Sequence, residues 1–554
     1  MRRAFCYALD LLIIAAGAVI LFLLIGGGGV YRMAGTVVRL RSVGNPLIVL
    51  GLLLAARYVC RRAAPFLGVG NWALDDADRR TLRSLLGAHV SASRLPVSRG
   101  WRWTTIVAIV ALSLKLTFAW MHPGFHQGDD VEIQEMTIGT LTHAQWPIWN
   151  IRSAVFPMGV IYPLQRLARA AGVTSIDTTV FVGRASVALL STASILLVWR
   201  AGRLLFPAEA GYALLAVLLF ASNKLHISFG SSELPRPVVA VLLIAAFVVL
   251  LRHRTIAGAC AGGALLGLAA SLRYGEAGFV VAACLQLALE RRWTHLVACA
   301  LSSVLAAGAA LGVADALYWG RPFASLLNIV DYTIVKRASS AGPPPAAWWY
   351  VTSVSDWATW PVIGLAIIGT RRATWQTALW TWLPIAILSA LPPKEPRYMI
   401  PVMPFAALLA ANGVRSILAR WAVSPPVWHA APVALAAALT LGFLHDAGGW
   451  RLRRSNDDVR FAPTLAAQAT GGEGLAVEQL WRVGGHLYLG DVDPLIDLDP
   501  SVIRNAGLPA DVIARARSIA LDAQTASQPG VSDRLASAGY RAVMKTTSYV
   551  VFQR

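Results

Sequence analysis

Apolar segments long enough to cross a membrane recur along the whole chain, and they limit its fold more than any other feature. They lie at about 8–26, 46–60, 102–120, 180–198, 209–228, 234–251, 255–272, 276–290, 295–316, 350–369, 374–391, 398–414 and 427–445. A helix of about 20 apolar residues spans the hydrocarbon core of a bilayer. Charged residues make up only 14% of the chain, against about 25% in soluble proteins. We therefore predict a polytopic α-helical membrane protein with roughly 13 transmembrane helices.

Basic residues beside these segments predict their orientation. The formal net charge of +20 would suggest nucleic acid as the partner of a soluble protein. Here the arginines gather at alternate junctions between apolar segments, which is how membrane orientation is encoded. The clusters are Arg57 with Arg61 and Arg62, Arg200 with Arg203, Arg252 with Arg254, Arg291 with Arg292, Arg371 with Arg372, and Arg415 with Arg420. Arg39 with Arg41 is an exception and falls on the opposite side in this scheme. We predict a multi-pass protein of the cytoplasmic (inner) membrane with a cytoplasmic amino terminus, and no nucleic-acid partner.

Composition divides the chain into four regions. Residues 1–70 carry two extra amino-terminal spans, and 71–100 form a polar cytoplasmic linker. Residues 101–446 form a transmembrane module with a large first outer loop at 121–178. In 447–554, short strand-like runs alternate with helical stretches, a pattern typical of a small α/β domain. The charge pattern places this carboxyl-terminal domain outside the cytoplasm.

An acidic pair, Asp129 and Asp130, lies in the polar loop that follows the apolar segment at 102–120. Carboxylates beside a membrane helix are costly to place and often functional. An ionised carboxylate can take a proton from an attacking hydroxyl group. The alternatives are a solvated loop end or an ion pair with Arg152. Glu132 is expected on the polar face of a loop helix.

Four basic residues are predicted at the same outer level as the acidic pair. Lys394 and Arg397 lie in a very short outer loop, where they can pair with a phosphate at the membrane surface. Simple anchoring at the interface is the alternative for these two. Arg236 and Arg273 also fall on this side, although basic residues are disfavoured there. That makes them candidates for binding an anionic ligand.

Four motifs follow one another on this predicted outer face. They are Gly128-Asp129-Asp130; Ile151-Arg152-Ser153 with Pro157; Asp315-Ala316-Leu317-Tyr318-Trp319-Gly320 with Asn328 and Trp348-Trp349-Tyr350; and Lys394-Glu395-Pro396-Arg397-Tyr398. Over about 100–415 the chain resembles the membrane-embedded GT-C glycosyltransferases. Within them it resembles the family 22 mannosyltransferases, which build the lipid-linked N-glycan precursor and the GPI anchor. Two positions depart from the family pattern: Asp130 replaces a glutamate and Pro393 replaces a histidine.

The resemblance implies an inverting glycosyltransferase. Such an enzyme would move a sugar, mannose in the family, from a polyprenyl-phosphate donor to a glycolipid or glycan acceptor at the outer face of the bilayer. The predicted site residues are the base Asp129 or Asp130, the donor-phosphate ligands Lys394, Arg397, Arg273 and Arg236, and the acceptor- or loop-orienting residues Arg152, Glu132 and Tyr398. The resemblance also implies a metal-independent reaction without a cofactor.

Two other readings of the sequence remain open. Three histidines in the outer loop, His122, His126 and His143, can serve as metal ligands, but such residues are more often hydrogen-bonding groups, and we predict no metal site. A polytopic transporter or lipid-sugar flippase is the alternative function. Transporters carry their charges near the bilayer midplane in related halves, whereas this chain concentrates them at one surface.

Overall fold

A computed structural model describes residues 97–421 and 450–554, with short gaps at 123, 149–150, 208, 336–345, 372–373, 392–393, 469–473, 491, 501–502 and 504–507. It also describes a hairpin formed by β1 (Gly29–Met33) and β2 (Thr36–Leu40), and a few single residues near them. Apart from those single residues, the predicted spans at 8–26, 46–60 and 427–445 lie outside the described residues, as does nearly all of the 71–100 linker.

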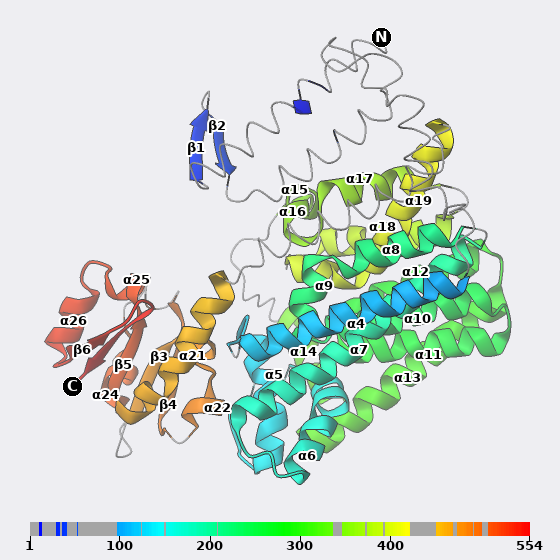
Figure 1. Ribbon diagram of the computed structural model, residues 1–554. Coiled ribbons are helices and arrows are strands. Elements are labelled where there is room, and N and C mark those ends of the chain that lie inside the picture. Colours follow the sequence, from blue (N-terminus) through cyan, green and yellow to red (C-terminus); the bar gives the residue numbers. More distant parts are fainter. Residues whose placement is uncertain are drawn as a thin grey trace.

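A helical bundle forms the larger part of the described chain (Figure 1). Its helices are α4 (Val97–Met121), α5 (Gly128–Thr142), α6 (Tyr162–Ala170), α7 (Ile176–Leu205), α8 (Ala210–Ala221), α9 (Lys224–Ser228), α10 (Arg236–Arg252), α11 (Ile256–Leu272), α12 (Gly278–Leu289), α13 (Trp293–Trp319), α14 (Ala324–Val330), α15 (Trp349–Thr352), α16 (Val354–Trp357), α17 (Trp360–Gly369), α18 (Trp375–Ala390) and α19 (Met403–Trp421). Shorter 3₁₀ and π turns join them, among them η3 (Pro157–Ile161), η4 (Phe229–Ser231), η5 (Tyr274–Ala277), η6 (Asp331–Val335) and η8 (Pro396–Val402).

Several of these helices can cross a membrane. Four stretches of the described chain are long and apolar enough, and they are Gly100–Met121, Ile176–Leu205, Trp293–Trp319 and Pro396–Ile417. A fifth span arises if α8 is joined to the α9–η4 segment, although the two are bent by 63°. The chain is therefore built as a multi-pass helical membrane protein, while the total of about thirteen spans stays a prediction.

Two predicted spans are interrupted in the structure. The segment 209–228 bends because the Asn223 side chain accepts hydrogen bonds from the backbone N–H groups of Leu225 and His226, and so starts a new helix. The segment 350–369 was predicted as one span but forms α15, α16 and α17. The chain is extended at Ala358, and Pro361 lies in the first turn of α17, where a missing N–H group costs nothing.

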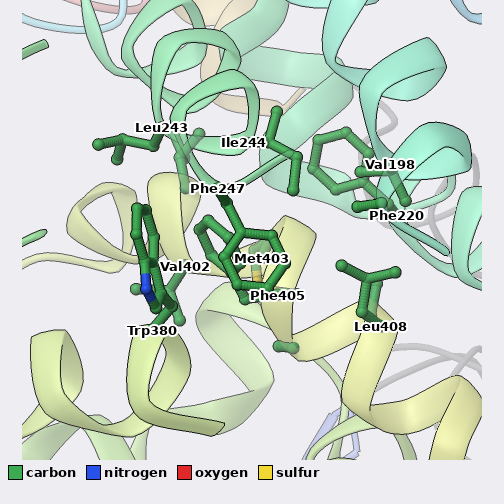
Figure 2. Packing of buried hydrophobic residues seen from close by; sticks show 14 of the residues in the cluster. Val198, Phe220, Leu243, Ile244, Phe247, Trp380, Val402, Met403, Phe405 and Leu408 are labelled. Atoms are coloured by element: carbon green, nitrogen blue, oxygen red, sulfur yellow. The ribbon is translucent and has the colours of Figure 1, made fainter. Parts of the chain in front are cut away.

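Aromatic side chains fill the centre of the bundle (Figure 2). Phe247 of α10, Trp380 of α18 and Phe405 of α19 are fully buried, with ring centroids 5.2–5.3 Å apart. Nearby, α17 and α19 approach closely at two glycines. A Cβ atom at Gly369 would lie 1.9 Å from the Leu409 carbonyl oxygen, and one at Gly413 would meet α17 in the same way. Small residues at such a crossing allow close helix packing in a membrane protein.

The carboxyl-terminal segment contains a five-stranded sheet, which we call the carboxyl-terminal unit together with its helices (450–554). Its elements are α21 (Trp450–Gln468), β3 (Gly474–Glu478), η9 (Leu480–Val483), α22 (His486–Leu489), β4 (Leu495–Leu498), α24 (Ala510–Arg515), β5 (Ala516–Asp522), α25 (Ala523–Ala526), α26 (Val531–Ser537), β6 (Arg541–Lys545) and β7 (Tyr549–Gln553). The strand order is β4-β3-β5-β7-β6, and β3 is parallel to both of its neighbours. Strands β3, β5, β6 and β7 coincide with strand-like runs in the sequence, whereas β4 was not foreseen. The location of this unit outside the cytoplasm stays a prediction.

Candidate active site

The acidic pair forms the first turn of α5. The helix begins after the extended residue Gln127, which provides no side-chain cap. Carboxylates in a first helical turn are stabilised by the positive end of the helix dipole. Successive helix residues point about 100° apart, so the two side chains enter different surroundings. The Asp129 side chain is 23% exposed, whereas Asp130 is completely buried.

Asp129 joins two arginines from distant parts of the chain. Its Oδ1 accepts a hydrogen bond from Arg152 Nη2 at 2.7 Å, and its Oδ2 lies 3.3 Å from Arg397 Nη2. Arg152 also pairs with Glu132, and Arg397 also pairs with Glu395. Burial raises the pKa of Asp129, but the guanidinium groups, that of Arg152 above all, outweigh it and lower the pKa to about 2. Asp129 is therefore ionised at neutral pH.

Asp130 has the opposite character. Its Oδ2 accepts a hydrogen bond from the backbone N–H of His126 at 3.1 Å, and its Oδ1 has no hydrogen-bond partner among the described residues. Complete burial and the nearby carboxylate of Glu233 raise its pKa well above the usual range. The protonated form is therefore favoured, which distinguishes Asp130 from its neighbour as a candidate base.

Beneath the pair lies a buried polar network that the sequence analysis did not single out. Arg184 of α7 donates from Nε to Glu233 Oε1 at 2.6 Å and from its other nitrogens to the carbonyl oxygens of His122 and Gly124. Gln134 of α5 donates to the same Glu233 oxygen at 3.1 Å. The network fastens α5 and the loop before it to the membrane-capable helix α7. Its sequence signal was weak: single polar residues inside apolar runs.

Three arginines surround the ring of Tyr398. The Cζ atoms of Arg236, Arg273 and Arg397 lie 4.1, 5.8 and 6.0 Å from the ring centroid. Arg236 is 2% exposed, and its Nε and Nη1 atoms make no hydrogen bonds to the described residues. Its nearest carboxylate is that of Glu276, with Nε and Oε1 3.8 Å apart. A buried cation with unused donors can bind an anion.

Buried Asp315 of α13 supports the loop that carries Arg152. Its Oδ1 accepts from the backbone N–H of Ala154 at 3.4 Å, and its Oδ2 accepts from the backbone N–H and the hydroxyl of Ser325. Trp319 Nε1 donates to the Arg152 carbonyl oxygen at 3.2 Å. Two motifs that are far apart in sequence thus meet here, and the second fixes the backbone of the first.

The remaining predicted residues have other surroundings. Lys394 Nζ donates to the carbonyl oxygen of Leu391 at 2.7 Å, so its predicted role at a phosphate stays a prediction. In the motif Trp348-Trp349-Tyr350 the side chains differ in burial. Trp348 is exposed, but Tyr350 is completely buried, because its short helix packs into the bundle core. Within the described parts of the chain, no group of three or more His, Cys, Asp or Glu side chains is placed to hold a metal ion.

Known proteins resemble the chain in both sequence and fold. Residues 135–458 match the profile of the Alg9-like mannosyltransferase family. The structure of ArnT from Cupriavidus metallidurans bound to undecaprenyl phosphate is similar, with a TM-score of 0.56 and 16% identity over 81% of this chain and 97% of that chain. The arabinofuranosyltransferase AftD from Mycobacteria has a TM-score of 0.50 and 15% identity over 82% of this chain and 40% of that chain. No curated protein matches.

The structural likenesses show that the fold is that of the GT-C glycosyltransferases. The family profile covers more than half of the chain, including α5 from Glu135 onward, the three arginines around Tyr398 and most of the bundle. The chain therefore belongs to the Alg9-like mannosyltransferase family, and it is a multi-pass membrane glycosyltransferase.

Proposed function

We propose that the protein transfers mannose, with inversion, from a polyprenyl-phosphate donor to a hydroxyl group of a glycolipid or glycan at the outer face of the membrane. The observation that carries this proposal is the shared ion pairing of Asp129 with Arg152 and Arg397. It places an ionised carboxylate beside a cluster of cations, so that a base and an anion-binding group adjoin each other.

The donor phosphate binds between Arg236, Arg273 and Arg397. Arg236 offers buried donor atoms that make no hydrogen bonds to the described residues, and Arg397 already neighbours the base. A guanidinium group recognises phosphate oxygens through parallel charge-assisted hydrogen bonds. The similar ArnT structure holds undecaprenyl phosphate, a lipid of the same chemical class as the proposed leaving group.

Asp129 acts as the base in a single displacement. The acceptor oxygen attacks the anomeric carbon as its proton passes to the Asp129 carboxylate, and the bond from that carbon to the phosphate oxygen breaks. The polyprenyl phosphate leaves with the bonding electrons, and the arginines stabilise the charge that develops on it. Because attack and departure take place on opposite faces, one displacement inverts the anomeric configuration.

Asp129 becomes a stronger base when the donor is bound. In the free enzyme its pKa of about 2 reflects two guanidinium neighbours. When the donor binds, Arg397 also pairs with its phosphate group. The ion pair between Arg397 and Asp129 is then weaker, and the pKa of Asp129 rises toward the working pH. Three arginines supply positive charge to a monophosphate, so we propose that the reaction proceeds without a metal ion. Arg152, Glu132 and Tyr398 orient the loop and the acceptor.

A panel of donors tests this function. Purified protein in nanodiscs is incubated with polyprenyl-phosphate mannose, glucose or arabinose and with GDP-mannose, using an alkyl mannoside as the acceptor probe. We expect released polyprenyl phosphate and an inverted product from the mannosyl lipid, with the same rate in EDTA. The proposal would be overturned if only GDP-mannose served as the donor, or if the product retained the anomeric configuration of the donor. It would also be overturned if EDTA abolished activity and Mg²⁺ or Mn²⁺ restored it.

A further inference from the structure

The carboxyl-terminal unit contacts the helix that carries the acidic pair. Helix α22 lies beside α5 in Figure 1, and both α22 and η9 contact α5. Trp481 of η9 packs over Gly128, the residue before Asp129, with its Cβ 3.8 Å from the place that a Gly128 Cβ would take. At Gly485, which has a φ of +58°, a Cβ would lie 2.3 Å from Glu135 Oε1. The loop after β3 therefore follows the surface of α5 closely.

Polar contacts fix the register of this interface. Glu135 Oε1 accepts hydrogen bonds from the backbone N–H of His486 at 2.7 Å and from its Nδ1 at 3.0 Å. The Glu135 side chain is 6% exposed, so these bonds lie mostly out of water. The His486 ring also stacks on Trp146, and the Tyr488 hydroxyl donates to Asp177 at the start of α7. Helices α5 and α7 of the bundle are thus both tied to the short helix α22.

An apolar cluster makes the interface continuous. Its buried members come from the loop before α5, from α5, α7, α21 and α22, and they are Phe125, Val131, Ile138, Val180, Val459 and Leu487. Removal of these apolar side chains from water stabilises the contact between the two parts. The carboxyl-terminal unit is therefore packed on the bundle rather than tethered to it.

Helix α5 needs such support. It has no side-chain cap at its amino end and runs for only 15 residues. Short helices owe most of their stability to tertiary packing. Glu135 lies six residues after Asp129, about 9 Å along the helix axis. Together with the bond from Gln134 to Glu233, a contact at Glu135 therefore helps to set where the first turn of α5, and Asp129 with it, meets the arginines.

We propose that the loop 479–486 of the carboxyl-terminal unit is a positioning element of the active site, with His486 and Glu135 as positioning residues that hold Asp129 between Arg152 and Arg397. The inference rests on the proposed function of Asp129. It gives the carboxyl-terminal unit a role in the transfer step, distinct from donor binding, which the arginines perform.

The test compares two substitutions of His486 in the full-length protein. His486→Asn keeps a side-chain donor near the position of Nδ1, whereas His486→Phe keeps a ring that can stack on Trp146 but has no donor. Displacement of a reacting group by about 1 Å can cost about a hundredfold in rate. We therefore expect kcat of His486→Phe to fall by about ten- to a hundredfold, with the donor KM unchanged, and His486→Asn to retain most of the activity. Arg541→Ala, at an exposed position on β6, is the matched control and should behave as wild type.

Amide hydrogen exchange separates this proposal from the proposed function. In His486→Phe the amides of α5 should exchange faster than in wild type, while those of β5 and β7 keep their protection and show that the unit is folded. If β5 and β7 lose protection, the contact is tested at Glu135 instead. Glu135→Leu removes the acceptor and Glu135→Gln keeps one, and kcat and the exchange of α5 are compared between these two variants. His486→Phe loses only the side-chain bond, since the backbone N–H of residue 486 can still donate to Glu135, whereas Glu135→Leu loses both bonds. Unchanged kcat and unchanged α5 exchange in both variants would overturn the inference. If even the wild-type protein transferred no sugar, only the proposed function would be overturned. Amide exchange of α5 in the variants would still show whether the loop 479–486 holds this helix in place.

Discussion

Replacement of Arg152 by glutamine should shift the pH dependence of the transfer reaction. Arg152 Nη2 lies 2.7 Å from Asp129 Oδ1, and its charge is the largest of those that lower the pKa of this carboxyl. A guanidinium neighbour lowers the pKa of an aspartate by about 1–3 units. Its removal should raise the pKa of Asp129 from about 2 to about 3–5. Each unit corresponds to about 1.4 kcal/mol between the two protonation states.

The sign of the effect follows from the role of the base. Asp129 must be ionised to accept a proton, so activity falls as the pH drops through its pKa. In wild type this acid limb of kcat/KM lies below the range of ordinary assays. In Arg152→Gln it should enter that range, so the variant loses more activity at pH 4.5 than at pH 7.5. The rate of polyprenyl phosphate release, measured between pH 4 and 8, gives the profile.

Two controls make the result specific to Asp129. Arg152→Lys keeps a positive charge and should keep the acid limb close to that of wild type. Burial also raises the pKa of Glu132, the second partner of Arg152, so Glu132→Gln combined with Arg152→Gln tests whether Glu132 titrates instead. An acid limb that does not move in Arg152→Gln, or that disappears when Glu132 is replaced, would show that Asp129 is not the titrating base.

Three further substitutions test the donor site, the loop support and the core. Arg236→Gln should raise the donor KM by about 10- to 150-fold, the equivalent of about 1.5–3 kcal/mol for a hydrogen bond to a charged group; an unchanged KM would remove Arg236 from the phosphate site. Asp315→Leu leaves the buried donors of Ala154 and Ser325 unpaired, at a cost of about 1–3 kcal/mol each, so thermal unfolding in nanodiscs should begin at a lower temperature. Phe405→Ala should cost about 3–5 kcal/mol by opening a cavity in the aromatic core, and a melting temperature equal to that of wild type would contradict the packing in Figure 2.

Those parts of the site that depend on apolar segments and on the distribution of charged residues could be predicted from the sequence. Apart from the interrupted segments 209–228 and 350–369, the apolar segments between 102 and 414 coincide with helices, because a bilayer leaves few alternatives to a continuous helix. The charge pattern put the acidic loop and the 392–397 loop on one face, and in the structure Arg397 lies 3.3 Å from Asp129. Orientation of the bundle in the membrane and the number of spans stay predictions.

Contacts between polar residues that are distant in the chain could not be predicted from the sequence. Asp129 and Asp130 look equivalent in sequence, and only their burial and their neighbours lower the pKa of the first and raise the pKa of the second. Nothing in the periodicity of α5 singles out Glu135 as the partner of His486, since either residue suits a solvated surface equally well. Strand β4 was missed because its run Leu-Ile-Asp-Leu lies between prolines and aspartates that normally mark loops.

The role of Asp129 as the base is tested most directly by comparing Asp129→Asn with Asp130→Asn in a single-turnover assay with polyprenyl-phosphate mannose. An asparagine resembles the protonated acid, so it removes the base at 129 but changes little at 130, where the neutral form is favoured. Loss of a general base costs about 10²–10⁴ in rate. We expect such a loss for Asp129→Asn with donor binding intact, and substantial activity in Asp130→Asn. Full activity in Asp129→Asn, or a loss confined to Asp130→Asn, would contradict the assignment of Asp129 as the base.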